Sequence, residues 1–304
     1  MDFLLLINPG ARRAARIDTA ALAAPWAAQG VTEVVVSKSR GQARQACAQA
    51  VSAGAKAVVI VGGDGSANNA AGRLLGSRSA LAVIGAGTTN VIARSIGVPR
   101  DPVVASASLA RGWADGGSQP VPVGRANDAI FLANAGVGFD AAVVRRVEAS
   151  PNKKRLCGHV WFLAAALLES SAARQLDLSV SVVTRHGDRL GPAPTCFVAA
   201  LRTGAYTFIG CRPLHLSPGS GLRPGLHGVW LTRPGRAALA RVAATALTAK
   251  GPGNGFVTRV EDIEAIEISA AQPAPFQVDG DLVGHADQVR IDLHPEPLML
   301  IRPG

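Results

Sequence analysis

The chain has 304 residues, enough for one or two domains with a sizeable core, and its hydrophobic content of 48% excludes a disordered chain. Its 31 Lys and Arg residues outnumber 21 Asp and Glu residues, so the net charge of +10 favours anionic partners such as nucleotides, nucleic acids or anionic lipids. Aromatic residues make up only 4% and do not alternate with basic ones, which argues against a specific nucleic-acid partner.

The cysteines and apolar runs indicate a cellular location. The four cysteines lie far apart with no C-x-x-C pair, which fits a reducing compartment and predicts neither a disulfide framework nor a zinc site. Asp2 stands where a signal peptide has a basic residue, and the apolar run 160–168 is far shorter than the about 20 residues of a membrane span. We therefore expect a cytoplasmic protein that associates with membranes peripherally.

The first third of the chain alternates apolar, β-branched runs with Ala-rich stretches four times. Alternation with short connections is typical of a parallel sheet covered by helices on both faces. Ligands of such sheets bind outside the carboxyl ends of the strands, where Asn8, Ser37, Asp64 and Asn90 are predicted to converge. Strands are predicted at residues 3–7, 31–36, 57–61 and 81–84, and helices at about 19–28, 42–53, 67–75, after Asn90 and around 102–111.

The most informative segment is Gly62-Gly63-Asp64-Gly65-Ser66, between a buried strand and a helix that Ser66 is predicted to cap. A glycine turn that opens a helix directs backbone N–H groups and the positive helix end to one place, which suits a phosphate. Asp64 adds specificity, because a carboxylate beside a phosphate is repulsive unless it binds a cation, a proton or a hydroxyl group. The alternative is an ordinary β-turn with Asp at a favoured position. The segment matches neither the dinucleotide fingerprint nor the P-loop.

A change of pattern marks a second domain. Gly116-Gly117-Ser118 and two prolines interrupt the alternation, and we place a boundary near residue 122. Beyond it, short β-like runs between turn residues predict a mostly antiparallel β-sandwich, interrupted by helices at about 139–148, 154–172 and 236–249. The β-like runs are 129–134, 176–184, 195–201, 226–232, 256–260, 263–268, 275–279, 289–293 and 298–301.

Four motifs occur in the order found in the diacylglycerol kinase catalytic family. The glycine loop resembles the GGDGT signature shared by diacylglycerol kinases, sphingosine kinases, NAD kinases and phosphofructokinases. The other motifs are similar to that family's NP, GT-x-N-x-x-A-R and V-D-G-E segments. They are Asn8-Pro9-Gly10, Gly87-Thr88-Thr89-Asn90 with Ala93-Arg94, and Gln277-Val278-Asp279-Gly280-Asp281, and Gly136-Val137-Gly138-Phe139-Asp140-Ala141 accompanies them. The chain therefore resembles a bacterial lipid kinase of that family.

The resemblance implies an architecture and an activity. Residues 1–122, completed by 297–304, would form an α/β nucleotide-binding domain like that of phosphofructokinases and NAD kinases. Residues 123–296 would form a β-sandwich that binds the lipid substrate, with the active cleft between the two. The implied activity is ATP- and Mg²⁺-dependent transfer of the γ-phosphoryl group to a hydroxyl of diacylglycerol or a related lipid alcohol at the membrane surface. The metal ligands stay unassigned, and a homodimer is left open.

The resemblance also assigns roles to residues. Asp279 is the family's usual candidate for general base, and Asp64 would hold the Mg-nucleotide and is the second candidate for base. By sequence alone, Asp279-Gly280 between two β runs is a stronger signal for a hairpin turn. Asp140 would lie near the lipid head group, or cap the following helix. The nucleotide contacts would come from Asn8, Pro9, Ser37, Gly62, Gly63, Asp64, Gly65, Ser66, Gly87, Thr88, Thr89, Asn90 and Asp281.

Two departures from the family pattern keep other functions open. Asn69 and Val91 stand where many members carry carboxylates, so a catalytically weak module that binds nucleotide and membrane is one alternative. An NAD kinase is the other alternative. It predicts a second glycine-rich Thr/Ser cluster late in the chain, which this sequence lacks. A basic cluster is either a solvated surface or a contact with an anionic bilayer. The cluster consists of Arg145, Arg146, Lys153, Lys154 and Arg155.

Overall fold

The computed structural model describes residues 1–11, 18–149, 169, 177–217, 222, 224–231, 245, 248, 255 and 257–304. The chain forms two compact units: unit 1 is Met1–Pro122 with Pro295–Gly304, and unit 2 is Val123–His294. The helices predicted at 154–172 and 236–249 lie almost entirely outside the described residues, as do the basic residues at 153–155.

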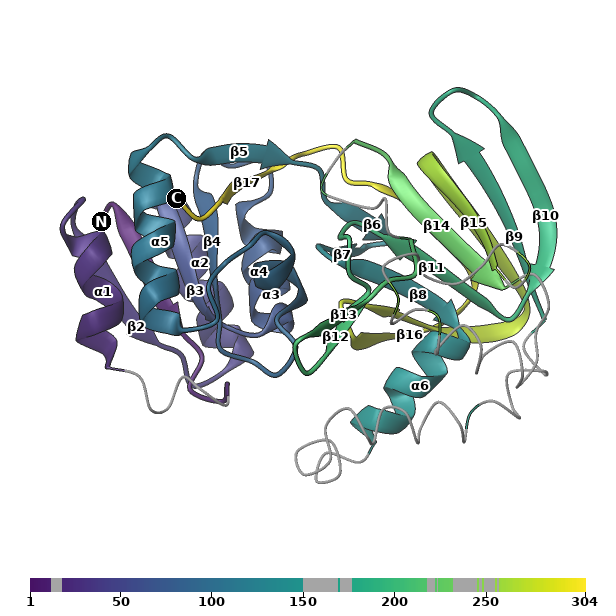
Figure 1. Ribbon diagram of the computed structural model, residues 1–304, viewed down its shortest axis with the longest axis horizontal. Helices are drawn as coiled ribbons and strands as arrows, with labels where there is room; N and C mark the ends of the chain where they lie inside the picture. Colours follow the sequence, from purple (N-terminus) through teal and green to yellow (C-terminus); the bar gives the residue numbers. More distant parts are fainter. Residues whose placement is uncertain are drawn as a thin grey trace. The chain divides into compact units, whose positions relative to one another are not determined.

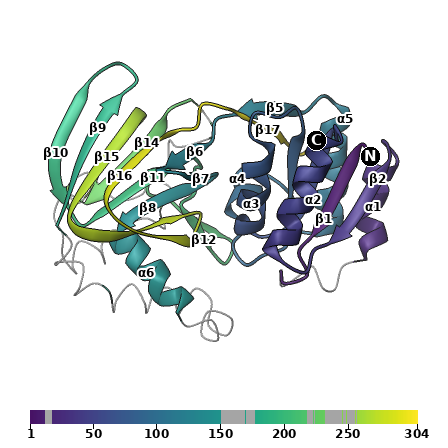
Figure 2. The same ribbon diagram turned by 180° about the vertical axis from the view of Figure 1, so that it is seen from behind.

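Unit 1 is a sheet of mostly parallel strands between two layers of helices (Figures 1 and 2). Its strands are β1 (Phe3–Ile7), β2 (Thr32–Val36), β3 (Ala57–Gly62), β4 (Ala80–Gly85), β5 (Ser118–Val121) and β17 (Leu298–Ile301). Its helices are α1 (Thr19–Ala27), α2 (Arg40–Ser52), α3 (Asp64–Leu74), α4 (Val91–Ser95) and α5 (Pro102–Ala114). The strand order is β2-β1-β3-β4-β17-β5, and only the β17–β5 pair is antiparallel.

The central strands of this sheet are apolar along their whole length because helices cover both faces. Every residue of β1, β3 and β4 is buried, as expected for parallel strands between two helical layers. Helix α1 packs against α5, and α2 packs against α3. The parallel α/β prediction is therefore confirmed, and the last strand of the chain, β17, completes this sheet beside β4.

The start of α3 differs from the prediction. The helix begins at Asp64, and its N-cap is Gly63, which makes no side-chain capping bond. Ser66 lies inside the first turn, so its predicted role as the N-cap is wrong. Strand β3 ends at Gly62 and the helix begins at Asp64, so the N-cap position falls on Gly63, which has no side chain to form a capping bond.

Unit 2 is an antiparallel β structure with one described helix, α6 (Phe139–Glu148). Its strands are β6 (Gly124–Ala126), β7 (Ala129–Phe131), β8 (Asn134–Gly138), β9 (Leu178–Thr184), β10 (Arg189–Thr195), β11 (Phe197–Leu201), β12 (Thr207–Ile209), β13 (Arg212–Leu214), β14 (Leu226–Leu231), β15 (Val257–Val278) and β16 (Asp281–Leu293). The main sheet has nine strands, and β12 and β13 form a separate pair. The runs predicted at 256–260, 263–268 and 275–279 are a single strand, β15. The strands β6, β10, β12 and β13 were not predicted from the sequence.

The long strand β15 joins the two halves of this unit. It pairs with β14 near its start, with β9 in its middle and with β8 at its end. Because β11 pairs with both β8 and β14, the sheet closes on itself through β15. Alternate residues of the strands, including Val137, Val180, Val198, Ile266 and Ile291, meet in one core. The antiparallel β prediction is confirmed.

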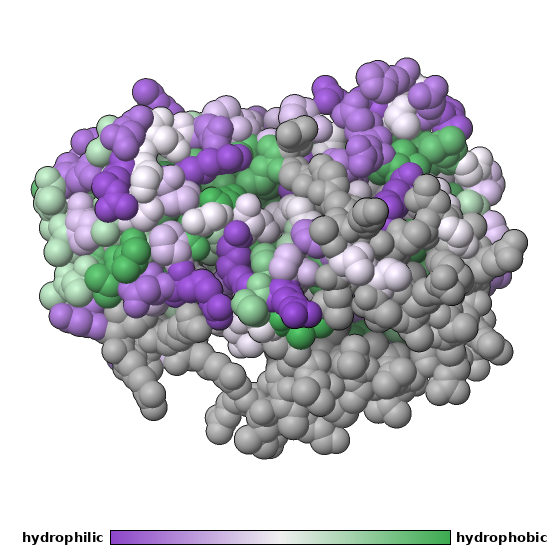
Figure 3. Space-filling model, in the orientation of Figure 1, coloured by the Kyte–Doolittle hydropathy of each residue, from purple (hydrophilic) through white to green (hydrophobic). Residues whose placement is uncertain are grey.

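The surface of the described residues is mixed. On the face in Figure 3, hydrophobic side chains occur in small groups among hydrophilic ones. The edge strand β2 exposes Val34 and Val36, 37% and 48% of whose surface is accessible. Within the described ranges, no helix combines the length and the apolar character needed to cross a membrane.

Candidate active site

The loops that follow four parallel strands of unit 1 lie at the same edge of the sheet. Ile7 at the end of β1 pairs with Val36 of β2 and with Val61 of β3, and Gly62 pairs with Gly85 of β4. The next residues along the chain therefore lie in one row at the carboxyl ends of the strands. These residues are Asn8, Ser37, Gly63 and Ala86.

Glycine is required where two of these loops touch. A Cβ atom on Gly87 would lie only 2.8 Å from the Cα of Gly63, and one on Gly62 would lie 2.7 Å from the Cβ of Ser66. Only residues without a Cβ let these backbones approach so closely. The loop after β3 and the loop after β4 therefore form one continuous backbone surface.

Asn8 connects the loop after β1 to the glycine loop. Its Nδ2 donates to the Oγ of Ser66 at 2.9 Å, and its Oδ1 accepts from the backbone N–H of Gly10 at 3.0 Å. Ser66 thus bonds across the site instead of capping its own helix. Ser37 lies one strand further out, where it is buried and donates from its Oγ to the carbonyl of Ile7 at 3.3 Å. Pro9 is exposed beside Asn8.

Asp64 connects the glycine loop to the next helix. Its Oδ1 accepts a hydrogen bond from the backbone N–H of Ile92, in the first turn of α4, at 3.0 Å. A carboxylate in the first turn of its own helix, α3, is also stabilised by the positive end of the helix dipole. The side chain is partly exposed, so it can meet a ligand at this edge of the sheet.

Asn90 holds the second loop closed. Its backbone is left-handed, with φ 52° and ψ 51°, a conformation that Asn tolerates better than most residues. Its Oδ1 accepts from the N–H of Gly87 at 2.8 Å, and its Nδ2 donates to the carbonyl of Gly87 at 3.0 Å. The side chains of Thr88 and Thr89, at the tip, are exposed and partly exposed.

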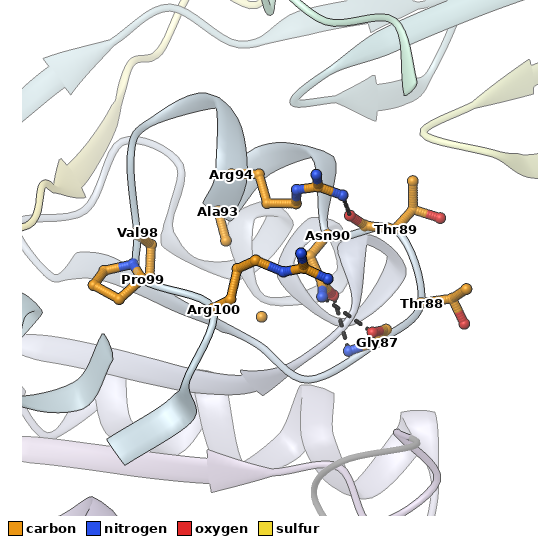
Figure 4. A pocket seen from close by; sticks show the side chains of 10 residues that line it. Gly87, Thr88, Thr89, Asn90, Ala93, Arg94, Val98, Pro99 and Arg100 are labelled. Carbon is orange, nitrogen blue, oxygen red and sulfur yellow. Dashed lines mark hydrogen bonds between the residues drawn. The ribbon is translucent and has the colours of Figure 1, made fainter. Parts of the chain in front are cut away.

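A small pocket lies on this second loop (Figure 4). The guanidinium group of Arg94 reaches the carbonyl of Thr89 at 3.5 Å, and Arg100 extends toward the same segment. Two arginines beside a backbone loop favour binding of a phosphate oxygen or another anion. The pocket is lined by Gly85, Gly87, Thr88, Thr89, Asn90, Ala93, Arg94, Val98, Pro99 and Arg100.

Asp279 lies in unit 2 at a two-residue hairpin turn. Val278 of β15 pairs with Asp281 of β16, and the two residues between them, Asp279 and Gly280, have φ values of 49° and 82°. Positive φ at both central positions defines the tight turn that an Asp-Gly pair favours. The hairpin interpretation is therefore correct for the backbone, and Asp281 begins the second strand of the hairpin.

The carboxylate of Asp279 is held by three backbone N–H groups. Its Oδ2 accepts from Leu132 at 2.8 Å, and its Oδ1 accepts from Ala133 at 2.7 Å and from Asn134 at 3.0 Å. Three such donors fix the plane of the carboxylate. The side chain remains partly exposed, so it is an oriented carboxyl group at the surface of unit 2.

The side chain of Asp140 lies in a buried hydrogen-bond network of unit 2. The N-cap of α6 is Gly138, so Asp140 does not cap this helix. Its side chain is buried, with Oδ1 accepting from the hydroxyl of Tyr206 and Oδ2 accepting from Nε2 of Gln277 at 2.7 Å. Burial raises the pKa of Asp140, although the two hydrogen bonds act in the opposite direction. The carboxylate thus bonds to two side chains of its own unit, and its role as a substrate contact stays a prediction.

Comparison with known proteins shows what unit 1 is similar to. Residues 2–126 match the sequence model of the diacylglycerol kinase catalytic domain. Over these residues the chain is similar to that family. The whole chain is also similar in fold to a solved structure described as a diacylglycerol kinase from Bacillus anthracis, with a TM-score of 0.70, 19% identity, and coverage of 99% of this chain and 96% of that chain. The resemblance seen in the motifs and the fold class are thereby confirmed.

Curated relatives of this kinase family match over shorter lengths. A Pseudomonas aeruginosa protein named "Probable lipid kinase YegS-like" is 31% identical over 172 residues, which are 56% of this chain and 55% of that protein. A diacylglycerol kinase of Mycobacterium tuberculosis is 34% identical over 149 residues, which are 47% of this chain and 46% of that protein. The chain thus spans about half the length of the curated relatives that it matches.

Unit 1 offers few ligands for a metal ion. Asn69, at a position where many family members carry a carboxylate, binds Arg44 of α2 through its Oδ1 at 2.7 Å, and Val91 is buried. No group of three His, Cys, Asp or Glu side chains that could enclose a metal occurs among the described residues. Mg²⁺ usually keeps several waters and needs only one or two carboxylates together with substrate phosphates. Asp64 fits that mode of binding.

The described part of the basic cluster makes local contacts. Arg146 forms an ion pair with Glu169, and Nη1 of Arg145 lies 3.5 Å from Nε2 of His285. The other three members lie outside the described residues.

The sequence motifs gave no role to several residues that lie in or near these sites. Arg100 follows the second loop, and Tyr206 and Gln277 surround Asp140. The one available signal was the amide of Gln277 in a strand between the apolar residues Phe276 and Val278. A polar residue at such a place needs a buried partner. Its partners are distant in the sequence, so the pattern alone did not identify them.

Proposed function

We propose that this protein is an ATP-dependent lipid kinase. It transfers the γ-phosphoryl group of ATP to a hydroxyl of diacylglycerol or of a related lipid alcohol. The bond between the γ-phosphorus and the bridging oxygen of ADP breaks, a bond to the lipid oxygen forms, and ADP leaves. The products are ADP and a lipid phosphate. The match of residues 2–126 to the diacylglycerol kinase catalytic domain supports this reaction class.

The observation that carries the proposal is the contact between the two glycine loops of unit 1. Phosphoryl transfer depends mainly on positioning and on neutralising the charge of the phosphates. Gly63 and Gly87 bring the backbones of the two loops into contact, and Asp64 bonds to Ile92 just beyond the second loop. Backbone donors beside a carboxylate suit a phosphate chain that carries a cation.

In this proposal most of the motif residues bind the nucleotide or its metal ion. The nucleotide is bound by the loops that contain Asn8-Pro9, Ser37, Gly62–Ser66 and Gly87–Asn90. Mg²⁺ would be held by Asp64 together with the phosphates, and when bound it neutralises the charge that develops on them. Asp281 remains proposed as a further nucleotide contact.

Asp279 is proposed as the general base. The proton of the lipid hydroxyl moves to the carboxylate of Asp279 as the new P–O bond forms. The N–H groups of Leu132, Ala133 and Asn134 hold that carboxylate in one orientation before the reaction. A fixed orientation of the base favours the proton transfer, because positioning contributes much of the catalysis of phosphoryl transfer.

A transfer assay with labelled ATP tests the proposal. Diacylglycerol, monoacylglycerol and a sphingoid base are presented in zwitterionic and in anionic vesicles, because the net charge of +10 favours an anionic membrane surface. We expect transfer to at least one lipid, and a loss of about 10²-fold or more in Asp64→Ala and in Asp279→Asn. The Asp279→Asn protein should bind ATP nearly as well as the wild type, and Asp287→Asn, at an exposed position, is the matched control. Wild-type rates in Asp279→Asn would remove this residue from the mechanism.

The same assay separates the second candidate function. Asn69 pairs with Arg44 and Val91 is apolar, so neither supplies a carboxylate to a metal ion, which is the observation that favours a catalytically weak module. Such a module would bind ATP and vesicles without consuming ATP on any lipid of the panel. NAD as the acceptor serves as the control for an NAD kinase.

A further inference from the structure

The amide of Gln277 is the centre of a buried hydrogen-bond network in unit 2. Only 1% of the residue's surface is accessible. Its Nε2 donates to Oδ2 of Asp140 at 2.7 Å and to Oδ1 of Asn134 at 3.1 Å, and its Oε1 accepts from the backbone N–H of Gly280 at 2.8 Å. The amide thus uses both of its donors, and its oxygen serves the residue that follows Asp279.

The hydrogen-bond partners of Gln277 determine which way its amide faces. In the reverse orientation, the oxygen of Gln277 would face the carboxylate of Asp140 and its NH₂ group would face the N–H of Gly280. Both contacts would be repulsive. The hydroxyl of Tyr206 donates to the other oxygen of Asp140, and burial together with the charge of Asp140 raises the pKa of Tyr206, which keeps this hydroxyl protonated.

The backbone around this network leaves space for it. Gly136 of β8 is the strand partner of Gln277. A Cβ atom at Gly136 would lie 1.9 Å from Oδ2 of Asp140 and 2.8 Å from Nε2 of Gln277. The hydrogen bond between Asp140 and Gln277 therefore occupies the space that any other residue at position 136 would fill.

The network holds both sides of the Asp279 turn. Gly280 is bonded to Gln277, and the backbone N–H of Asn134 donates to Asp279 at 3.0 Å. The side chain of Asn134 is in turn fixed, because its Oδ1 accepts from Gln277 and its Nδ2 donates to the carbonyl of Tyr206 at 3.0 Å. The backbone N–H of Asp279 donates to the carbonyl of Asn134 at 2.8 Å, which closes the connection.

We propose that Asp140, Tyr206 and Gln277 are positioning residues that hold the turn at Asp279, so that its carboxylate is presented in a single orientation for the reaction. This role rests on the proposed function of Asp279. None of the three residues contacts the reacting atoms. They act through Gly280 and Asn134, the two residues that fix the turn and the carboxylate.

Four variants test the role. Gln277→Leu removes every bond of the amide at similar volume. Asp140→Leu removes the acceptor. Asp140→Asn keeps an oxygen that accepts from Gln277, and its NH₂ group can donate to the hydroxyl oxygen of Tyr206. The matched control is Thr195→Val, which removes a buried hydroxyl of the same unit that bonds Phe197. This control has no bond to the Asp279 turn.

Two measurements are made on each variant. The first is kcat and KM for lipid phosphorylation. A misplacement of about 1 Å can cost about 10²-fold in rate, so we expect kcat to fall about 10- to 100-fold in Gln277→Leu and in Asp140→Leu, with the KM for ATP little changed. Asp140→Asn should recover most of that loss, and Thr195→Val should keep the wild-type kcat. The second measurement is amide hydrogen exchange of the segments 131–135 and 277–281, which should accelerate in the two Leu variants only.

The outcomes separate this role from the function on which it rests. A wild-type kcat in Gln277→Leu, or an equal loss in Thr195→Val, overturns the positioning role even if the protein is a lipid kinase. Should the wild type phosphorylate no lipid, the proposed function fails, and hydrogen exchange decides the remaining question. Faster exchange in both segments of Gln277→Leu then supports the structural link to the turn, and unchanged exchange overturns it.

Discussion

The glycine loops of unit 1 and the Asp279 turn of unit 2 hold their functional groups in different ways. In unit 1 the groups are held by the backbone and by other residues of the same motifs, as Asn90 is by Gly87 and Ser66 is by Asn8. In unit 2 the carboxylate of Asp279 is held by residues about 145 positions away in the sequence. Short motifs therefore describe the first site almost completely, and describe only the reactive residue of the second.

The largest expected effect comes from placing a methyl group between the two loops of unit 1, which tests whether their contact forms the site. In Gly87→Ala the new Cβ would lie 2.8 Å from the backbone of Gly63, so the loops must separate. We expect the free energy of unfolding to fall by about 1–3 kcal/mol. ATP affinity should fall about tenfold or more, which corresponds to about 1.4 kcal/mol per tenfold. Isothermal titration with ATP and chemical unfolding measure the two effects.

Gly41→Ala is the matched control for this substitution. Gly41 lies in α2, and its new Cβ would meet only the Oγ of Ser39 at 3.8 Å, an ordinary contact. We expect ATP affinity to stay the same and stability to rise by about 0.4–1 kcal/mol, because alanine restricts the unfolded chain. ATP binding at wild-type strength in Gly87→Ala would show that the contact of the loops does not form the nucleotide site.

The same contrast explains what could be predicted from the sequence. The alternation of apolar runs predicted the parallel sheet and the row of Asn8, Ser37 and the two glycine loops, because the order of strand ends follows from local pattern. The N-cap of α3 was assigned to Ser66 in error, because the bond from Asn8 that engages Ser66 crosses between strands. Capping rules do not contain such long-range partners.

Long-range contacts also limited the prediction of unit 2. The strand β15 was read as three short runs, because its polar and charged residues interrupt the apolar pattern while the ladder with β9 and β16 continues. The family resemblance implied that Asp140 lies near the lipid head group. Its burial depends on Tyr206 and Gln277, which lie 66 and 137 positions further along the chain.

A pH dependence of stability is the next expected effect, and it comes from Asp140 in unit 2. Burial raises the pKa of Asp140 above its ordinary value of 3.8. The native state therefore binds this proton more tightly than the unfolded state. The resulting stabilisation is fully present below the ordinary value and is lost as pH rises through the raised pKa of the folded state.

Asp140→Asn removes this titration. The stability of the wild type relative to Asp140→Asn should therefore fall as pH rises above about 4, with a slope of at most about 1.4 kcal/mol per pH unit, and then become constant. Urea unfolding of both proteins at a series of pH values gives the difference. Asp287→Asn, at an exposed position of the same unit, should show no such slope. Parallel curves for the wild type and Asp140→Asn would contradict the assignment of a raised pKa to this carboxyl group.

The smallest expected effect uses two buried cysteines, one in each unit. Cys47 lies in α2 of unit 1 and Cys196 lies in unit 2, both almost fully buried, and burial raises the pKa of each thiol to about 11. Neither thiol should react with a labelling reagent until its own unit opens. Cys211 is exposed and Cys157 lies outside the described residues, so both are replaced by serine for this experiment.

Labelling rates then report on each unit separately. We expect Gly87→Ala to accelerate labelling of Cys47, and Gln277→Leu to accelerate labelling of Cys196, by about fivefold for each 1 kcal/mol of lost stability. The other cysteine should keep its rate in each case, because each compact unit is expected to open by itself. Equal acceleration of both thiols in either variant would mean that the two units open together. The two sites would then share one free energy of unfolding. They would differ only in which residues hold their functional groups.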